Sequence, residues 1–234
     1  MCGFAGFTDC RGVDQAQAEN FAFKVSEVLK HRGPDAFGTW IDAQAGVVLA
    51  HTRLSIVDTS NAGLQPMASQ SKRYIICFNG EIYNHRQLRF ELDNQLHGFD
   101  WRGNSDTETL LACVETFGLS KTLKKLEGMF AFCLWDRESH SIFLARDRVG
   151  EKPLYFGQVG KAWFFSSELK AFHLHPEFSA KIERRALFDY MRNGCVSGTR
   201  SIFAGVSKVK PGGYVQIDTL NDKVMKNILY SVGF

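Results

Sequence analysis

A cysteine stands directly after the initiator methionine, at position 2 of this chain. Once Met1 is trimmed, Cys2 becomes the first residue and carries both a thiol and a free α-amino group. The thiolate is the reactive form of cysteine, and a free thiol has a pKa of about 8.5. The α-amino group, with an ordinary pKa of about 8, can take or relay the thiol proton. Cys2 is therefore a candidate N-terminal nucleophile, although its position alone fits a chance cysteine equally well.

The residues after Cys2 indicate how such a nucleophile would be held. Gly3, Ala5 and Gly6 alternate with Phe4 and Phe7, which predicts a short buried strand. Glycines in a strand let another backbone or a ligand approach closely. A thiol at the exposed start of a buried strand would be rigidly positioned, as a catalytic group requires.

Two charged residues could bind the ends of an amino-acid substrate. Arg53 stands beside alternating apolar residues. It is either an outward-facing charge on an edge strand or a bidentate partner for a substrate carboxylate, which arginine binds better than lysine does. Asp106 lies at the start of a predicted helix, where it either stabilises the first turn or pairs with a substrate ammonium.

An Asn-Gly pair at Asn79 and Gly80 follows an apolar run at residues 74–78. Such a pair is ordinarily a hairpin turn. No matching strand follows, because residues 84–96 carry leucines at helical spacing. We therefore predict a sharp turn from strand to loop that exposes the Asn79 amide and the Gly80 N–H, two donors suited to an oxyanion.

Composition restricts the class of protein. The chain has 234 residues, 44% of them hydrophobic, which suits one globular domain. A net charge of +3 is too small to indicate nucleic-acid binding. The longest apolar run, residues 129–135, is too short to span a bilayer, and residues 1–9 lack the pattern of a signal peptide. We expect a cytoplasmic protein with no nucleic-acid or membrane partner.

Six cysteines occur without a C-x-x-C pair, and we expect them to be free thiols in a reducing compartment. His173 and His175 fall where a short helix meets a proline, so no metal site is predicted.

The elements that must position these residues follow from apolar periodicity. Helices are predicted at residues 14–31, 84–96, 106–117, 167–172 and 182–192. Ser105 should cap the third helix, with Glu108 completing a capping box. Beyond the first strand, strands are predicted at residues 47–50, 74–78, 129–135, 141–145, 154–156, 162–166, 202–209 and 214–217. The last two are expected to form a hairpin through residues 211–213, and the tail from Asn221 onward is assigned no structure.

The strands between residues 129 and 166 are almost continuously apolar, which indicates that both of their faces are covered. Two layers of buried strands with helices before and between them imply an α+β fold, a four-layer αββα sandwich.

An ordered set of short motifs runs through these elements, and together they are far more specific than any one alone. The motifs are Met1–Gly3, His31–Asp35, Arg53–Val57, Asn79–Asn84, Ser105–Glu108, Gly128–Phe132, Asp147–Tyr155 and Ser167–Lys170. With them the sequence resembles the glutaminase domain of the class II glutamine amidotransferases, and most closely the amino-terminal half of glutamine-hydrolysing asparagine synthetase. The resemblance covers nearly the whole chain to about Ile217.

The resemblance implies the αββα fold of the N-terminal nucleophile hydrolases and a mechanism. Cys2 would attack the side-chain amide of glutamine, giving a thioester and ammonia, and water would then release glutamate. Asn79 and the Gly80 N–H match the family's oxyanion hole, and Arg53 matches its clamp on the α-carboxylate. The remaining glutamine-binding positions implied are Glu81 and Asp106 at the α-amino end, and the backbone of Leu54, Ser55, Ile56 and Val57.

The resemblance also implies a division into domains. Residues 2–217 would be the glutaminase domain, and residues 218–234 a tail or the start of a linker to a synthetase domain absent from this chain. The Ser-Gly-Gly-x-Asp-Ser phosphate loop of that second domain does not occur in the sequence. We therefore expect no cofactor for this domain, with ATP and Mg²⁺ needed only at the synthetase domain.

The expected partners are glutamine as substrate, an ammonia-accepting domain or subunit, and a second copy of the chain in a homodimer. Two alternatives stay open. The same glutaminase chemistry could feed another acceptor, such as a different carboxylate or a sugar, or the chain could be a non-catalytic regulatory module that has kept the fold.

Overall fold

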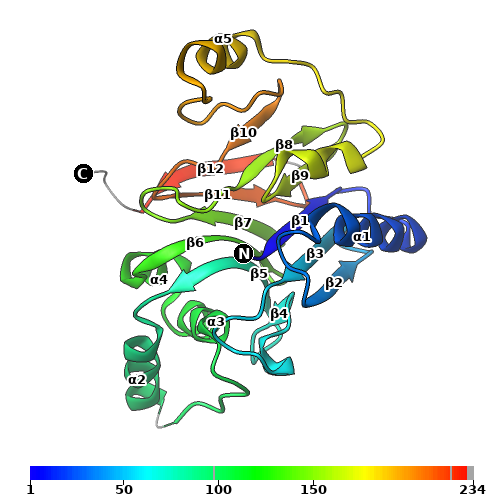
Figure 1. The fold of residues 1–234 in the computed structure, drawn as a ribbon. Helices are drawn as coiled ribbons and strands as arrows, with labels where there is room; N and C mark the ends of the chain where they lie inside the picture. The colour runs from blue at the N-terminus through cyan, green and yellow to red at the C-terminus, as the bar shows by residue number, and fades with distance from the viewer. Residues whose placement is uncertain (97, 222, 231–234) are drawn as a thin grey trace.

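Two antiparallel β-sheets form the centre of the molecule (Figure 1). The computed structural model describes residues 1–96, 98–221 and 223–230, and in this part of the chain each sheet has six strands. The first sheet has the order β10 (Val206–Lys208), β8 (Tyr155–Val159), β9 (Ala162–Ser166), β1 (Gly3–Thr8), β3 (Val47–Arg53) and β2 (Ala36–Asp42). The second has the order β12 (Lys223–Leu229), β11 (Gly213–Asp218), β7 (Ser141–Arg146), β6 (Gly128–Asp136), β5 (Tyr74–Ile82) and β4 (Met67–Ala68).

Helices cover the outer faces of both sheets. Helix α1 (Gln15–Leu29) and the 3₁₀ helix η2 (Leu169–Leu174) lie on the first sheet. Helices α2 (His85–Leu96), α3 (Asp106–Phe117) and α4 (Leu119–Lys125) lie on the second. A short 3₁₀ helix, η1 (Asn61–Gly63), precedes β4. The predicted four-layer αββα sandwich is confirmed.

Three apolar clusters correspond to the three contacts between these four layers. One lies between α1 and the first sheet, one between the two sheets, and one between the second sheet and its helices. Alternate residues of a strand face opposite sides, so a strand buried on both sides reads as a continuous apolar run. This explains why β6 and β7 carry almost no polar residues in their centres.

Helix α1 shows how closely periodicity predicts a helix. Its buried residues include Ala18, Ala22, Val25 and Leu29, spaced by three and four. The Asp14 carboxylate caps the helix by accepting from the Gln17 N–H at 3.0 Å. The helix ends two residues before the predicted limit.

The C-terminal strands differ from the prediction. Strand β10 pairs with β8 in the first sheet, whereas β11 pairs with β7 in the second, so the predicted hairpin is wrong. Residues 209–212 instead carry the chain from one sheet to the other, and Gly212 adopts a left-handed conformation there. Strand β12 pairs along β11, so much of the tail that was assigned no structure extends the second sheet; residues 222 and 231–234 lie outside the described residues.

Two further elements, β2 and α5, differ from the prediction. Strand β2 was not predicted, because its residues are half-buried or exposed and give a weak apolar pattern. Helix α5 (Arg184–Asn193) begins two residues later than predicted and lies outside the sandwich (Figure 1). None of the described helices is long and apolar enough to cross a membrane.

Candidate active site

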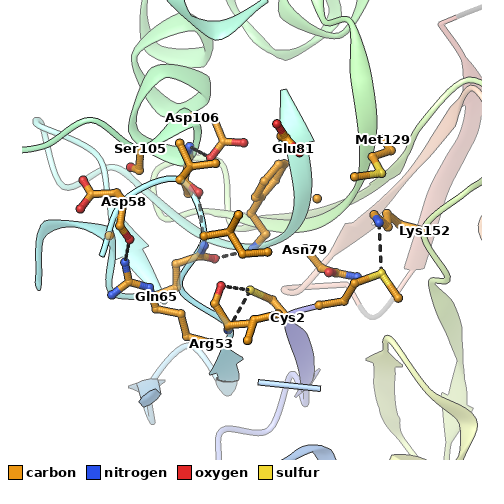
Figure 2. Close-up of a pocket in the computed structure, with 18 residues that line it drawn as sticks. Cys2, Arg53, Asp58, Gln65, Asn79, Glu81, Ser105, Asp106, Met129 and Lys152 are labelled. Atoms are coloured by element: carbon orange, nitrogen blue, oxygen red, sulfur yellow. Dashed lines mark hydrogen bonds between the residues drawn. The ribbon is translucent and has the colours of Figure 1, made fainter. Parts of the chain in front are cut away.

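Three strands point predicted site residues into the layer between the sheets. That layer contains buried residues from each of these strands, among them Phe4 of β1, Leu49 of β3 and Cys77 of β5. Side chains at alternate positions share a face of a strand, so Cys2, Arg53 and Asn79 point the same way. These three residues line one pocket of about 90 Å³, to which Glu81 and Asp106 also contribute (Figure 2).

The Cys2 thiol is partly buried and contacts the backbone of Leu54. The Leu54 N–H donates to Sγ at 3.4 Å, and Sγ lies 3.6 Å from the Leu54 carbonyl oxygen. Burial raises the pKa of the Cys2 thiol, while the Leu54 backbone, the N-terminal charge and Arg53 act against that rise. A thiol in this setting needs a base to become a nucleophile.

Arg32 holds the backbone of Cys2 in place. Its Nε donates to the Cys2 carbonyl at 2.9 Å, and a terminal nitrogen donates to Glu168 at 2.8 Å. Gly3 permits this contact, because a Cβ there would lie 2.9 Å from Arg32 Cδ. Taken alone, residues 31–35 read only as a helix stop, and no local signal in the sequence indicates that this arginine reaches back to Cys2.

Glu168, the N-cap residue just before η2, completes this support. Burial works to raise its pKa, but hydrogen bonds from Arg32, His31 and Lys170 outweigh burial and lower the pKa of Glu168 to about 2. The carboxylate therefore stays charged and keeps Arg32 fixed against Cys2.

The Asn79 side chain has the features of an oxyanion donor. It is 1% exposed, and its Nδ2 donates to no residue that the structure describes. A buried amide without an acceptor is costly. Because Asn79 lines the pocket with Cys2, an oxyanion formed on a bound substrate could be the acceptor that its Nδ2 lacks.

Gly80 does not lie in a turn: β5 continues through it to Ile82 and pairs with β6, so the predicted strand-to-loop turn is wrong. Its N–H can still donate because β4 pairs only with Ile75 and Ile76 and leaves that side of β5 uncovered beyond them. The Phe78 N–H donates to Gln65 at 2.6 Å, and the Ile82 N–H donates to Asp106 at 2.9 Å, both away from β6. Because N–H groups at alternate positions point the same way, the Gly80 N–H faces this same side.

Arg53 is 6% exposed, and a loop of the backbone fixes its guanidinium. The group donates to the carbonyl of Ser60 at 2.9 Å and to the carbonyl of Asp58. Gly63 allows the close approach, since a Cβ there would lie 2.3 Å from an arginine nitrogen. A guanidinium has five N–H donors, and the hydrogen bonds to residues that the structure describes use two of them, so the others could donate to a ligand such as a carboxylate.

Asp106 begins α3 and is 5% exposed. Burial raises the pKa of Asp106 to about 6, although the backbone amides of Ile82 and Thr107 act in the opposite direction. The group is therefore charged at neutral pH and could pair with an ammonium in the pocket.

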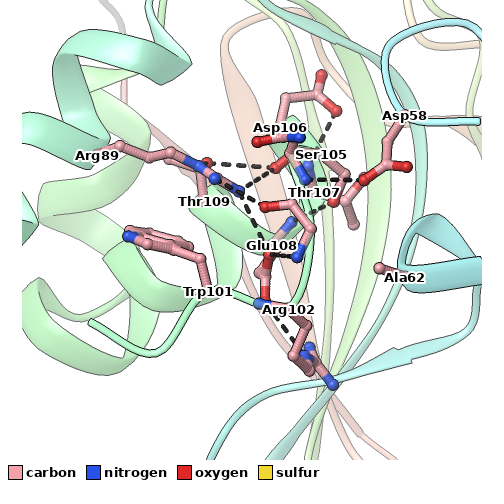
Figure 3. Close-up of polar contacts among 12 residues, drawn as sticks. Asp58, Ala62, Arg89, Trp101, Arg102, Ser105, Asp106, Thr107, Glu108 and Thr109 are labelled. Carbon is pink, nitrogen blue, oxygen red and sulfur yellow. Dashed lines mark hydrogen bonds and ion pairs between the residues drawn. The ribbon is translucent and has the colours of Figure 1, made fainter. Parts of the chain in front are cut away.

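The start of α3 is fixed by a polar network (Figure 3). Ser105 caps the helix as predicted, accepting from the Glu108 N–H at 3.2 Å. The predicted capping box is not closed, because the Glu108 carboxylate accepts from the backbone of Arg102 and Gly103 at 2.9 and 3.1 Å. Arg89 forms an ion pair with the same carboxylate at 3.3 Å.

The segment after Arg53 lines the pocket only in part. Leu54, Ile56 and Val57 are among the described lining residues, whereas Ser55 is not. The Ser55 N–H donates to Asp35 at 2.8 Å instead. The pocket also contains residues that sequence reasoning did not assign to it: Met1, Asp58, Gly63, Gln65, Phe78, Ser105, Thr107, Met129 and Lys152.

Residues 1–227 match the family described as the glutamine amidotransferase domain. The chain belongs to this family. It is 36% identical over 227 residues to the glutamine-hydrolyzing asparagine synthetase 1 of Bacillus subtilis, covering 97% of this chain and 35% of that protein. It is 39% identical over 172 residues to the glutamine-hydrolyzing asparagine synthetase B of Escherichia coli, covering 73% of this chain and 30% of that protein.

This glutamine amidotransferase domain therefore spans about a third of the length of these curated relatives. Its fold is similar to that of the glutamine phosphoribosylpyrophosphate amidotransferase of B. subtilis, with a TM-score of 0.70 and 21% identity. That match covers 99% of this chain and 50% of the other chain. The resemblance to class II glutamine amidotransferases, and the fold it implies, are confirmed.

Proposed function

We propose that this domain hydrolyses glutamine to glutamate and ammonia through a thioester on Cys2, once Met1 has been removed. The observation that carries the proposal is the convergence in one pocket of a thiol, a fixed guanidinium, a buried carboxylate and an unpartnered amide. A nucleophile alone would fit many reactions. The two opposite charges fit the zwitterionic end of an amino acid.

In the proposed reaction the α-amino group of Cys2 takes the thiol proton, and the thiolate attacks the side-chain carbonyl carbon of glutamine. Asn79 Nδ2 and the Gly80 N–H donate to the oxyanion that forms. The C–N bond then breaks, and the proton passes to the leaving ammonia. Water attacks the thioester and releases glutamate, which restores the thiol.

Arg53 would bind the α-carboxylate of glutamine, and Asp106 and Glu81 its α-ammonium. Leu54, Ile56 and Val57 would form the wall beside them. This chemistry needs no cofactor within the domain.

The ammonia would pass to an acceptor domain that makes asparagine in the cytoplasm. The names of the relatives support this acceptor, because both are glutamine-hydrolysing asparagine synthetases. A different carboxylate or a sugar as acceptor would use the same pocket. A non-catalytic module would have no reason to keep all of Cys2, Arg53, Asn79 and Asp106.

Glutamate release by the purified domain tests the proposal. The domain with Met1 removed, verified by intact mass, should release glutamate, and Cys2→Ala should abolish this while leaving the fold intact. A form that retains Met1 or carries an amino-terminal tag should also be inactive, because the nitrogen of Cys2 is then part of a peptide bond and cannot act as a base. Cys10→Ala, a change at an exposed cysteine, is the matched control and should keep full activity.

A diazo-ketone analogue of glutamine should label Cys2 and none of the other five cysteines. Labelling at Cys77 or Cys133, or normal turnover by the tagged form, would overturn the assignment of the nucleophile and its base.

A further inference from the structure

Lys152 belongs to a motif that the proposed reaction leaves without a role, residues 147–155. Lys152 is 6% exposed. Its ammonium donates to the thioether sulfur of Met1 at 3.1 Å, and among the described residues it has no other hydrogen-bond acceptor. Thioether sulfur is a weak acceptor, and a buried ammonium is ordinarily paired with a carboxylate or several oxygens. The bond to Met1 Sδ is therefore too weak to offset the cost of burying the Lys152 ammonium.

The backbone around Lys152 is rigidly fixed. Asp147 is fully buried, and its carboxylate accepts from the Lys152 N–H at 3.0 Å and the Gly150 N–H at 2.6 Å. The Lys152 carbonyl accepts from Arg146 Nε at 2.7 Å. Anchored on both sides, the lysine cannot withdraw its ammonium into solvent by a shift of the loop.

The ammonium is directed at the amino terminus. Lys152 lines the same pocket as Met1 and Cys2, and in Figure 2 it lies on the opposite side of Cys2 from Arg53. Met1 is joined by its peptide bond to the nitrogen of Cys2. Removal of Met1 takes away the thioether and creates a new α-amine on Cys2, in the pocket that Lys152 also lines.

Charged groups from six segments line this pocket or contact Cys2: Arg32 after α1, Arg53 on β3, Asp58 in the loop before η1, Glu81 on β5, Asp106 on α3 and Lys152 after β7. Arg32 is paired with Glu168. Arg53, Glu81 and Asp106 lie on the side of the pocket where the proposed function places the zwitterionic end of glutamine. Lys152 is the cation left beside the new amine.

We propose that Lys152 sets the protonation of the Cys2 α-amine: its ammonium faces the amine in the trimmed protein and keeps the amine unprotonated, and so able to act as a base, at neutral pH. This inference rests on the proposed function. A nearby cation disfavours the protonated form of an amine, so it lowers the pKa of the amine. Removing the cation should raise that pKa and move the acid limb of activity to higher pH.

The test is Lys152→Met, which keeps a similar apolar stem and removes the charge. With trimmed protein at saturating glutamine, the acid limb of kcat should move up by about one pH unit, so that kcat at pH 7 falls roughly fivefold. At pH 9 the variant should approach the activity of the unchanged protein. The matched control is Lys208→Met, a partly buried lysine on β10 that contacts the Val196 carbonyl outside this pocket, and its profile should not move.

A loss of activity by the same factor at every pH would show a structural role for Lys152 and overturn the proposal. An acid limb of kcat that stays at the same pH in the variant would also overturn it. A direct titration covers the case in which the variant does not fold. In the trimmed, unsubstituted protein labelled with ¹³C-cysteine, the Cys2 Cα resonance should report an α-amine pKa about one unit below its ordinary value of about 8. A value of 8 or more would overturn the proposal. This titration also decides the case in which the domain shows no glutaminase activity, which would contradict the proposed function alone.

Discussion

Arg53 and Asn79 line the same pocket but would act at different points of the reaction. Arg53→Ala would leave a substrate carboxylate unpaired in a desolvated site, a loss of about 2 to 5 kcal/mol, and should appear mainly as a raised KM for glutamine. Asn79→Ala removes a donor needed mostly in the transition state, so kcat should fall by roughly 10² to 10³. Steady-state glutamate release measures both constants, and the opposite pattern would mean that the two roles are exchanged.

Asp106 should make glutamine binding sensitive to mild acid. Burial raises the pKa of Asp106 to about 6, so below that pH the carboxyl group becomes neutral and loses its attraction for the substrate ammonium. KM for glutamine should therefore rise as pH falls from 7 to 5, by at most about tenfold per unit. Asp106→Asn should give a high KM that is flat over this range, and a pH-dependent KM in that variant would assign the effect to another group.

At the scale of elements, the part of β5 that β4 leaves uncovered and the start of α3 meet at the pocket. The Ile82 N–H on that part of β5 donates to Asp106, and Ser105 caps the helix that carries Asp106. The position of the carboxylate thus depends on a helix cap as well as on a strand.

Ser105→Ala should lower stability by about 1 kcal/mol, since it removes a helix cap. For a domain of this size this corresponds to a fall in Tm of roughly 2 to 4 °C, measured by thermal unfolding followed by circular dichroism. Asp14→Ala, which removes the cap of α1 far from the pocket, should cost a similar amount. We expect only the Ser105 variant to raise KM as well; equal KM values would show that the cap does not help to place Asp106.

At the scale of the whole molecule, three buried apolar clusters hold the four layers together. Residues from both sheets line the pocket. The described glycines with positive φ lie in turns and loops, at helix ends and, for Gly128, at the start of β6. Activating a carboxylate with ATP calls for a glycine-rich loop whose amides and following helix hold the phosphates. The proposed division of labour between domains follows from this difference.

The isolated domain should therefore release glutamate and free ammonia, bind no ATP, and form no asparagine when aspartate, ATP and Mg²⁺ are supplied. Calorimetry with ATP and chromatographic assay of asparagine check these outcomes. Adding a separately made acceptor domain should raise glutaminase activity and couple it to product. Asparagine synthesis by the domain alone would contradict the proposed division of labour.

The sequence by itself determined the layers of the fold and predicted a set of candidate site residues. Periodicity sufficed for α1 and α3, because their buried faces repeat every three to four residues, and for β6 and β7, because strands covered on both faces read as apolar runs. The motif order predicted Cys2, Arg53, Asn79 and Asp106 as site residues, and the structure places all four in one pocket.

Only the tertiary structure decided how these residues meet. Pairing between distant strands placed β10 and β11 in different sheets and β12 beside β11, and local sequence does not encode a partner far along the chain. It also showed that Gly80 lies within β5, with its N–H facing the side that β4 leaves uncovered, rather than in a turn. The contacts of Arg32 with Cys2, of Glu108 with the Arg102 backbone and of Lys152 with Met1 depend on side chains reaching between segments, which spacing along one chain cannot reveal.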